Sequence, residues 1–183
     1  MNIHTFSAIA AQDATRGIGA KGGIPWSIPS DVKRFRMLTV GKICLMGRTT
    51  YESLPRPLVH RYHLVVSSTW DGDPEQSARI AEHGEVVGSL GEAVWDTIPR
   101  LVHSGWHPEI MVIGGGQIYQ QTLPIVSRVY LTTLADREMM GDVFFPILPP
   151  EEWDILHLDN STDPNYGVVK FAIYQRTKGL VHP

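Results

Sequence analysis

The chain has 183 residues, of which 43% are hydrophobic, and it carries a formal net charge of −3 at pH 7. This length supports one well-filled core, so we expect a single domain over residues 1–183. Lysine and arginine are scattered along the chain, and this excludes the basic patch of a nucleic-acid-binding protein. A small molecule is therefore the expected partner.

The composition also bounds where the protein works. Its only cysteine, Cys44, lies in the apolar run 43–46, which excludes an internal disulfide and indicates a reducing compartment. No apolar run approaches membrane-spanning length, and the first residues do not have the pattern of a secretory signal. We expect a soluble, cytoplasmic monomer with no membrane partner.

Short apolar runs alternate with helical patterns through the first two thirds of the chain. This alternation predicts an α/β fold with a mostly parallel central sheet of about eight strands and helices on both faces. The last two strands read as an antiparallel hairpin with a long loop at 163–167. The predicted strands are 6–11, 43–46, 63–66, 85–87, 110–113, 129–134, 153–158 and 168–174, helices follow Ser30, Gly47, Ser89 and Gly116, and 70–76 is predicted as a polar turn.

The stretch 24–35 places one carboxylate among apolar residues. Two prolines fix its approach, and Ser30 is expected to be the N-cap of a helix that has Asp31 in its first turn. Helical spacing puts Asp31, Phe35 and Leu38 on one face, where burial should raise the pKa of the acid. An acid on an apolar wall is suited to grip a polar ring, although the same residue could simply complement the helix dipole.

Three strand ends carry groups that suit a dinucleotide. They are 47–50, 67–69 and 114–116, and ligands collect at the carboxyl ends of parallel strands. The glycines let the backbone approach a pyrophosphate, and Arg48 with Ser68 offers a cation and a hydroxyl to a ribose 2′-phosphate. We therefore favour NADP over NAD. The spacing is not G-x-G-x-x-G, and each segment alone is also consistent with an ordinary turn.

Two further segments bear on motion and on metal binding. The glycine-rich segment 17–23 is typical of a mobile lid rather than a turn of fixed shape. His103 and His107 are four residues apart and could chelate a metal from a helix, but Gly105 lies between them and no third ligand is evident. We therefore expect no metal site.

Several motifs, in this order, resemble dihydrofolate reductase. They are the run 7–11, the glycine-rich segment that leads to Trp26 and Asp31, the triplet 46–48, the segment 56–58 and the strand-to-glycine run 112–116. The resemblance covers nearly the whole chain, down to Gly141 and Asp142 before Phe145 and Pro146. A tryptophan five residues before a carboxylate, combined with a triple glycine, is specific to that family.

The resemblance implies a dihydrofolate-reductase-like three-layer sandwich and a function. The enzyme would use NADPH to reduce 7,8-dihydrofolate to 5,6,7,8-tetrahydrofolate, with hydride transfer to C6 and protonation at N5. It would serve tetrahydrofolate synthesis and one-carbon metabolism, and it would bind antifolate inhibitors. Asp31 would hydrogen-bond the pterin with help from Thr132, Trp26 would hold a water, and Arg61 would pair with the carboxylate of the glutamate tail.

The resemblance also assigns the walls of the site. The carbonyls of Ile9 and Ile113 would face the pterin, Tyr119 would lie near the nicotinamide, and Gly114 and Gly115 would be joined by a cis peptide. The implied substrate-binding residues are Ile9, Ala10, Asp31, Val32, Phe35, Leu54, Arg61, Ile113 and Thr132. The implied cofactor-binding residues are Ala11, Ile18, Gly19, Gly47, Arg48, Thr49, Thr50, Ser67, Ser68, Ile113, Gly114, Gly115, Gly116, Gln117, Ile118 and Tyr119.

The chain departs from the commoner pattern in two places, and two other functions stay open. Ile24 replaces a Leu or Met of the lid, and 60–63 replaces a glycine-led, more basic stretch. Arg61 could also be an ordinary solvent-exposed loop arginine. A pyrimidine reductase of riboflavin synthesis would share the sheet and the glycine turn without needing the Trp26-to-Asp31 arrangement. A catalytically silent NADP-binding protein would keep the glycines but could lose the acid.

Overall fold

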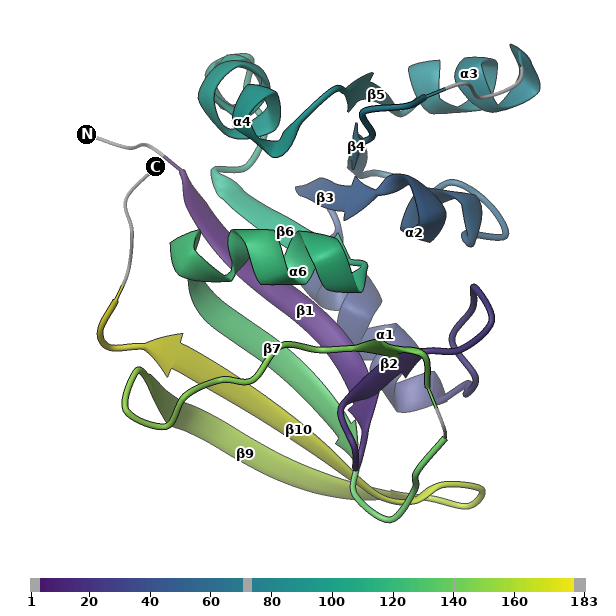
Figure 1. The fold of residues 1–183 in the computed structure, drawn as a ribbon, viewed down its shortest axis with the longest axis vertical. Coiled ribbons are helices and arrows are strands. Elements are labelled where there is room, and N and C mark those ends of the chain that lie inside the picture. The colour runs from purple at the N-terminus through teal and green to yellow at the C-terminus, as the bar shows by residue number, and fades with distance from the viewer. Residues whose placement is uncertain (1–3, 71–73, 140, 180–183) are drawn as a thin grey trace.

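The computed structural model describes residues 4–70, 74–139 and 141–179, and one eight-stranded sheet runs through its middle (Figure 1). The strand order is β5-β4-β3-β6-β1-β7-β10-β9. The pairs from β5 to β7 are all parallel, whereas β10 runs antiparallel to both β7 and β9. A mostly parallel sheet with an antiparallel C-terminal hairpin is therefore confirmed. The strands are β1 Thr5–Asp13, β3 Ile43–Gly47, β4 Tyr62–Val66, β5 Gly84–Val87, β6 Glu109–Gly114, β7 Val126–Leu134, β9 Trp153–Asp163 and β10 Gly167–Arg176.

Helices cover both faces of this sheet, which confirms the three-layer prediction. Side chains of α1, α2 and α3 pack on the face that holds Ile9 and Met46. Those of α6 and of the helix formed by α4, η1 and α5 pack on the face that holds Ala8 and Val112. Figure 1 shows α6 in front of the sheet and α1 behind it. The helices are α1 Pro29–Thr39, α2 Arg48–Glu52, α3 Pro74–Ala81, α4 Leu90–Glu92, η1 Ala93–Thr97, α5 Ile98–His103, α6 Gly116–Thr122 and η2 Leu123–Ile125.

The central strands form where the sequence has short apolar runs. All four residues of 43–46 are 0% exposed, because a parallel strand covered on both faces has no solvent side. Successive side chains of a strand point to opposite faces, and β1 shows this clearly. Ala8 and Ala10 join the core under α6, whereas Ile9 joins the core under α1. The register of β1 therefore decides which of its residues can reach each side.

The starts of two helices test the predicted caps. α1 begins at Pro29, and its N-cap is Ile28, which makes no side-chain capping hydrogen bond. The predicted Ser30 cap is therefore wrong, and the reason is that a proline at the first helical position is already fixed at a helical φ. Ser89 does cap the later helix, because its hydroxyl accepts the N–H of Glu92 at 3.1 Å.

Three local features differ from the prediction. Helix α3 covers part of the segment predicted as a turn, whose residues 71–73 lie outside the described residues. Part of the glycine-rich lid is a strand, β2 Gly17–Gly19, which pairs with β8 Val143–Phe144 in a second small sheet. The C-terminal hairpin turns within 164–166 and not through a long loop, because its pairing continues up to Asp163 and Gly167.

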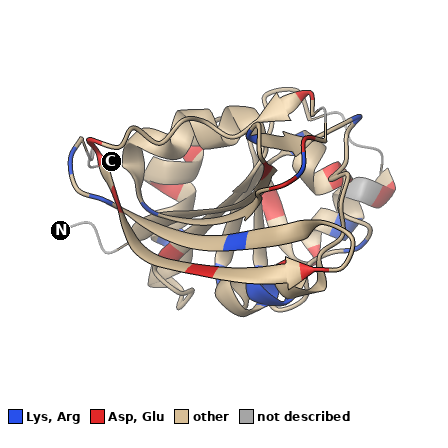
Figure 2. Ribbon diagram, turned by 90° about the horizontal axis from the view of Figure 1, so that it is seen from below, with Lys and Arg blue, Asp and Glu red and all other residues tan. Residues whose placement is uncertain are grey.

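Charged positions are spread over strands, helices and loops (Figure 2). Cys44 is a free and fully buried thiol, and burial raises its pKa to about 12, so it serves as a core residue. Within the described part of the chain, no helix is both long and apolar enough to cross a membrane.

Candidate active site

Asp31 and Thr132 meet where the first turn of α1 approaches the middle of the sheet. The Thr132 hydroxyl donates a hydrogen bond of 2.6 Å to Oδ1 of Asp31. Thr132 is 2% exposed because Ala11 and Phe171 flank it on the neighbouring strands. Burial raises the pKa of Asp31, and the Thr132 hydrogen bond and the charge of Arg34 offset only part of this effect. The expected direction of the pKa shift is therefore confirmed.

The acid lies beside an apolar wall. Phe35 and Leu38, one and two turns further along α1, pack against the buried core on this face of the sheet. Leu54, just after α2, and Ile113 of β6 pack against the same core. Val32 stays at the rim with 40% of its surface exposed. A flat ring with one polar edge fits this combination of a single carboxylate and apolar neighbours.

Trp26 is the buried tryptophan of the site, with 8% of its surface exposed. It packs in a small core with Ile28, Leu134 and Phe171. Its indole N–H is buried and meets no acceptor among the described residues. Because a buried donor without a partner costs free energy, this N–H is suited to bind a water or a ligand atom.

Tyr119 connects α6 to the central strand. Its hydroxyl donates a hydrogen bond of 2.6 Å to the carbonyl of Ile9, and its ring is 5% exposed. Burial raises the pKa of Tyr119, and the nearby charge of Asp31 acts in the same direction. The phenol therefore stays protonated beside the acid. The Ala10 side chain lies in the core under α6, so only its backbone is left for the predicted contact with the substrate.

The glycine turn after β6 lies beside the end of β3. Gly114 has a φ of 119°, and its bond to Gly115 is cis, as the resemblance implied. A methyl group on Gly47 would come within 3.2 Å of Ile118, and one on Gly115 would come within 3.3 Å of Thr50. Packing against these side chains therefore favours glycine at both positions, and the backbone there stays bare. Such a bare surface fits a pyrophosphate.

Arg48 lies at the point where β3 and β4 end side by side. Its Nε donates to Glu52 at 2.7 Å, and its Nη1 donates to the carbonyl of Thr69 at 2.8 Å. The guanidinium also lies over the ring of Trp70 at 5.8 Å. The predicted hydroxyl donors are on these same strand ends. They are Thr49 and Thr50 in α2 and Ser67 and Ser68 after β4. Gln117, also predicted to bind the cofactor, lies in the first turn of α6, after β6.

Arg61 is buried, so the alternative of an ordinary solvent-exposed loop arginine is wrong. It is 7% exposed, and its Nε donates to the hydroxyl of Thr39 at 2.8 Å. Its two terminal nitrogens donate to the carbonyls of Val59 and Arg36 at 2.9 and 3.3 Å. Burial lowers the pKa of this guanidinium. Three acceptors hold a fork that has two further N–H groups to offer a carboxylate.

Asp13 organises the lid, and sequence reasoning missed it. Its carboxylate is 0% exposed and accepts the N–H groups of Gly17 and Met139, both at 2.7 Å. Burial alone would raise its pKa, but these hydrogen bonds together with those from Thr15 lower it. The Asp-x-Thr-x-Gly pattern after a buried strand is the available signal, because such an acid often accepts nearby N–H groups.

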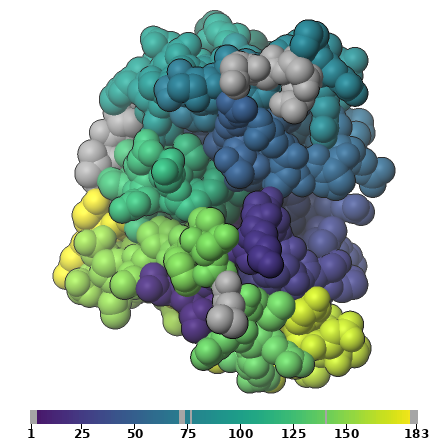
Figure 3. Space-filling view, turned by 45° about the vertical axis from the view of Figure 1, so that its right-hand side comes forward, coloured from purple at the N-terminus to yellow at the C-terminus, as the bar shows by residue number. Residues whose placement is uncertain are grey.

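The lid carries Ile18 and Gly19 and lies against the segment before β8. The N–H of Asp142 donates to the Gly19 carbonyl at 3.0 Å, and the Asp142 side chain accepts the N–H of Lys21 at 3.0 Å. In the space-filling view, the purple lid lies between the blue part of the chain that contains α2 and the green part around β8 (Figure 3). Ile24 is 66% exposed.

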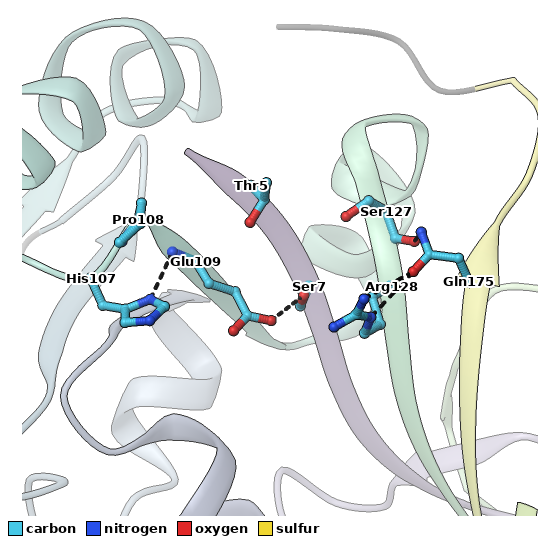
Figure 4. A pocket seen from close by; sticks show the side chains of 8 residues that line it. All are labelled: Thr5, Ser7, His107, Pro108, Glu109, Ser127, Arg128 and Gln175. Atoms are coloured by element: carbon cyan, nitrogen blue, oxygen red, sulfur yellow. Dashed lines mark hydrogen bonds between the residues drawn. The ribbon is translucent and has the colours of Figure 1, made fainter. Parts of the chain in front are cut away.

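Two further hollows open on the protein. One of about 390 Å³ lies between α1 and the sheet, where Leu38 and Met37 face Tyr130 and Ile173. The other, of about 310 Å³, lies at the amino end of β1 (Figure 4). There Ser7 donates to Glu109 at 2.6 Å, and the ring of His107 accepts the Glu109 N–H at 3.0 Å. His107 is therefore occupied by the backbone, and this polar hollow is largely satisfied by its own groups.

Comparison with known proteins places this geometry in one family. The family described as dihydrofolate reductase matches residues 5–176. The dihydrofolate reductase of Haemophilus influenzae is 37% identical over 82% of this chain and 84% of its own length. That of Bacillus subtilis is 34% identical over 93% of this chain and 94% of its own length.

A solved structure agrees with the sequence relatives. Dihydrofolate reductase from Enterococcus faecalis, complexed with NADP(H) and RAB-propyl, superposes with a TM-score of 0.78 at 25% identity. The match covers 95% of this chain and 97% of that one. The carboxylate on its apolar wall, the bare glycine turn and these relatives point the same way. The chain belongs to the dihydrofolate reductase family.

Proposed function

We propose that this protein reduces 7,8-dihydrofolate to 5,6,7,8-tetrahydrofolate with NADPH, and that the residues assembled above perform the reaction. The observation that carries the proposal is the Asp31–Thr132 pair, a carboxylate with a raised pKa fixed on an apolar wall. The bare glycine surface of β3 and β6 lies at the same end of the sheet. One edge of the fold therefore offers a ring site and a dinucleotide site together.

The residues at the strand ends fit NADPH. Gly47, Gly115 and Gly116 would border the pyrophosphate, because a backbone without side chains lets phosphate oxygens approach its N–H groups. Packing keeps these positions glycine, since methyl groups there would meet Ile118, Thr50 and Val143 at 2.8–3.3 Å. Arg48, Thr49, Thr50, Ser67 and Ser68 would hold the ribose phosphate end, and Ala11, Ile18, Gly19, Ile113, Gly114, Gln117, Ile118 and Tyr119 would hold the nicotinamide end. When bound, the cofactor supplies the hydride, which goes to C6 of the substrate.

Asp31 orients the pterin and favours its protonation at N5. Its carboxylate would accept hydrogen bonds from the polar edge of the ring, with Thr132 fixing the carboxylate in place. The buried N–H of Trp26 would hold a water on the substrate side. The proton that reaches N5 then comes from water, and the lid excludes the rest of the solvent.

The other substrate contacts follow from the walls. Val32, Phe35, Leu54 and Ile113 would enclose the pterin and the benzoyl ring, and the backbone of Ile9 and Ala10 would lie along the pterin. Arg61 would pair with the tail carboxylate through the N–H groups that its three protein acceptors leave available. The same surface would bind antifolates, because these share the flat polar ring.

A steady-state assay of NADPH oxidation tests this proposal. We expect oxidation with dihydrofolate and none with the pyrimidine intermediate of riboflavin synthesis. Oxidation with the pyrimidine alone would favour the riboflavin reductase, and cofactor binding without oxidation of either would favour a silent NADP-binding protein.

We also propose that the protein is a monomer and that it works in the reducing cytoplasm, where its single buried thiol stays reduced. Elution at twice the monomer mass in size-exclusion chromatography would contradict the monomer.

A further inference from the structure

The substrate loop, residues 53–61 between α2 and β4, carries two of the proposed substrate contacts. Leu54 stands near its start and Arg61 at its end. Two prolines within the loop have no backbone N–H group through which they could be anchored. Arg79 of α3 donates a hydrogen bond to the carbonyl of Leu54 at 3.0 Å and so anchors the start of the loop.

The far end of the loop has an unfavourable backbone conformation. His60 has a φ of 58°, in the left-handed region that residues with a Cβ rarely adopt. Its carbonyl accepts the N–H of Gly41 at 2.8 Å. A strained residue keeps such a conformation only where the surrounding contacts determine it. The position of this end of the loop therefore depends on its anchors.

His63 supplies the anchor between these two ends. Its ring is 0% exposed on β4, and its Nε2 accepts the N–H of Leu58 at 3.1 Å, so the ring is neutral and protonated on Nδ1. That Nδ1 is buried and has no hydrogen-bond partner among the described residues. The carbonyl of Val59, the residue after Leu58, accepts Nη1 of Arg61 at 2.9 Å. The imidazole thus holds the peptide segment that orients the guanidinium.

We propose that neutral His63 is a positioning residue for the tail carboxylate of the substrate, which it affects by holding the Leu58 N–H and thereby Arg61. This inference rests on the proposed reduction of dihydrofolate. It assigns His63 no contact with the substrate and no part in hydride or proton transfer. The proposal therefore concerns discrimination between substrates that have the tail and substrates that lack it.

The surroundings of His63 keep it in the form that can accept a hydrogen bond. Burial lowers its pKa to about 4, and the positive charges of His83, Arg61 and Arg79 act in the same direction. The other groups that face it are the Tyr51 ring at 5.9 Å and Cys44, its partner in the register of β3. Protonation would turn the acceptor into a donor and break the contact with Leu58.

The test compares two substrates in two variants. His63→Leu removes the acceptor, and His63→Gln keeps an acceptor oxygen at a similar distance from the backbone. Dihydrofolate is compared with a 7,8-dihydropterin that carries a methyl group in place of the benzoylglutamate tail. We expect His63→Leu to raise KM for dihydrofolate by about five- to tenfold, the scale of one lost hydrogen bond, with kcat and the tail-less substrate little changed. His63→Gln should restore most of the difference.

His4→Leu is the matched control, because His4 is also a buried histidine and both of its ring nitrogens lack a partner among the described residues. This variant should keep the wild-type ratio of the two KM values. Equal effects of His63→Leu on both substrates, or an unchanged ratio, would overturn the positioning role. If the wild-type protein reduces neither substrate, the proposed function fails instead.

A pH series keeps the proposal testable if His63→Leu does not fold. In the wild type, the KM ratio of dihydrofolate to the tail-less pterin should rise relative to that of His63→Gln as pH falls from 6 towards 4. The carboxylates of dihydrofolate titrate equally in both experiments, so they cancel in this comparison. Identical pH profiles of the two proteins would contradict a role for neutral His63.

Discussion

Thr132 and Asp31 are 101 positions apart in the chain, yet the threonine hydroxyl donates a 2.6 Å hydrogen bond to the carboxylate. The threonine belongs to the rigid centre of the sheet, and the acid belongs to the first turn of a helix that packs on it. The bond therefore fixes the position of the acid relative to the strand ends where the cofactor would bind. It also partly offsets the rise in pKa that burial causes.

Thr132→Val should remove this bond while keeping the shape of the side chain. The pKa of Asp31 should rise further, because the ionised form loses its donor. A hydrogen bond to a charged group is worth about 1.5–3 kcal/mol, so kcat/KM for dihydrofolate should fall about tenfold or more at neutral pH. The pH–rate profile should move to higher pH.

Thr133→Val is the control for that experiment. Thr133 is the next residue on β7, so its side chain points to the other face, where its hydroxyl accepts a bond of 3.3 Å from Gln12. The same chemical change there should leave the profile in place. A pH profile that moves equally in both variants would show that the Asp31 contact has no special effect.

Arg48→Leu should weaken NADPH far more than NADH. The guanidinium lies where β3 and β4 end together, at the position proposed for the 2′-phosphate, and a charge-assisted contact of this kind is worth about 1.5–3 kcal/mol. Calorimetric titration with both nucleotides measures the difference. Arg100→Leu is the control, since Arg100 forms a comparable exposed ion pair with Glu85 at 2.6 Å. Equal losses for both nucleotides would refute the assignment of Arg48.

The sheet could be predicted because its strands have a strong local signal. A parallel strand that is buried on both faces requires a continuous apolar run. The sequence has such runs at 43–46 and 110–113. Helix α3 had no such signal, because Ile80 is its only fully buried apolar residue among those described. The pairing of β2 with β8 depends on contacts between segments more than a hundred residues apart, which no local pattern encodes.

The site was predictable to a different degree at each residue. Asp31 was visible from helical spacing, because the first turn of α1 fixes which side it faces. Thr132 and Trp26 came only from the family resemblance, since nothing local links a strand threonine to a helix acid. The sequence left open whether Arg61 is exposed, because its burial depends on the distant acceptors Thr39 and Arg36, and a loop arginine by itself predicts exposure.

Gly114→Ala should reduce both stability and NADPH affinity. Gly114 has a φ of 119°, which an alanine adopts only with strain, and an added methyl group would lie 3.1 Å from the ring of Tyr119. Displacing Tyr119 would also disturb its hydrogen bond to Ile9. Gly105→Ala is the control, because Gly105 has a similar φ of 106° but open space around it.

Gly105→Ala should therefore show the cost of strain alone. Urea unfolding and nucleotide titration of the two variants separate that cost from the effect of the collision with Tyr119. We expect Gly105→Ala to keep wild-type NADPH affinity. The same affinity in a folded Gly114→Ala protein would mean that the glycine turn is not a cofactor surface.

Asp31→Asn should change activity and stability in opposite directions. The ionised carboxylate orients the pterin, so its loss should slow single-turnover hydride transfer about 10²–10⁴-fold near neutral pH, with activity recovering towards low pH as the medium protonates the substrate. Burial raises the pKa of this acid in the folded state above its ordinary 3.8. The folded state then binds more protons than the unfolded state, so stability is lost as pH rises through the folded-state pKa.

Asparagine removes that loss, so the variant should be more stable than the wild type at pH 7, and the gain should shrink as pH falls towards 4. Asp13→Asn should instead lower the free energy of unfolding at pH 7. Hydrogen bonds lower the pKa of Asp13 in the folded state, so its ionised carboxylate stabilises the fold above the ordinary pKa, and this stabilisation is lost in acid. Urea unfolding across this pH range measures both variants. A wild-type rate in Asp31→Asn with an unchanged pH profile would remove Asp31 from the mechanism. A loss of stability at pH 7 would instead show that the acid is held in the fold by contacts stronger than its desolvation.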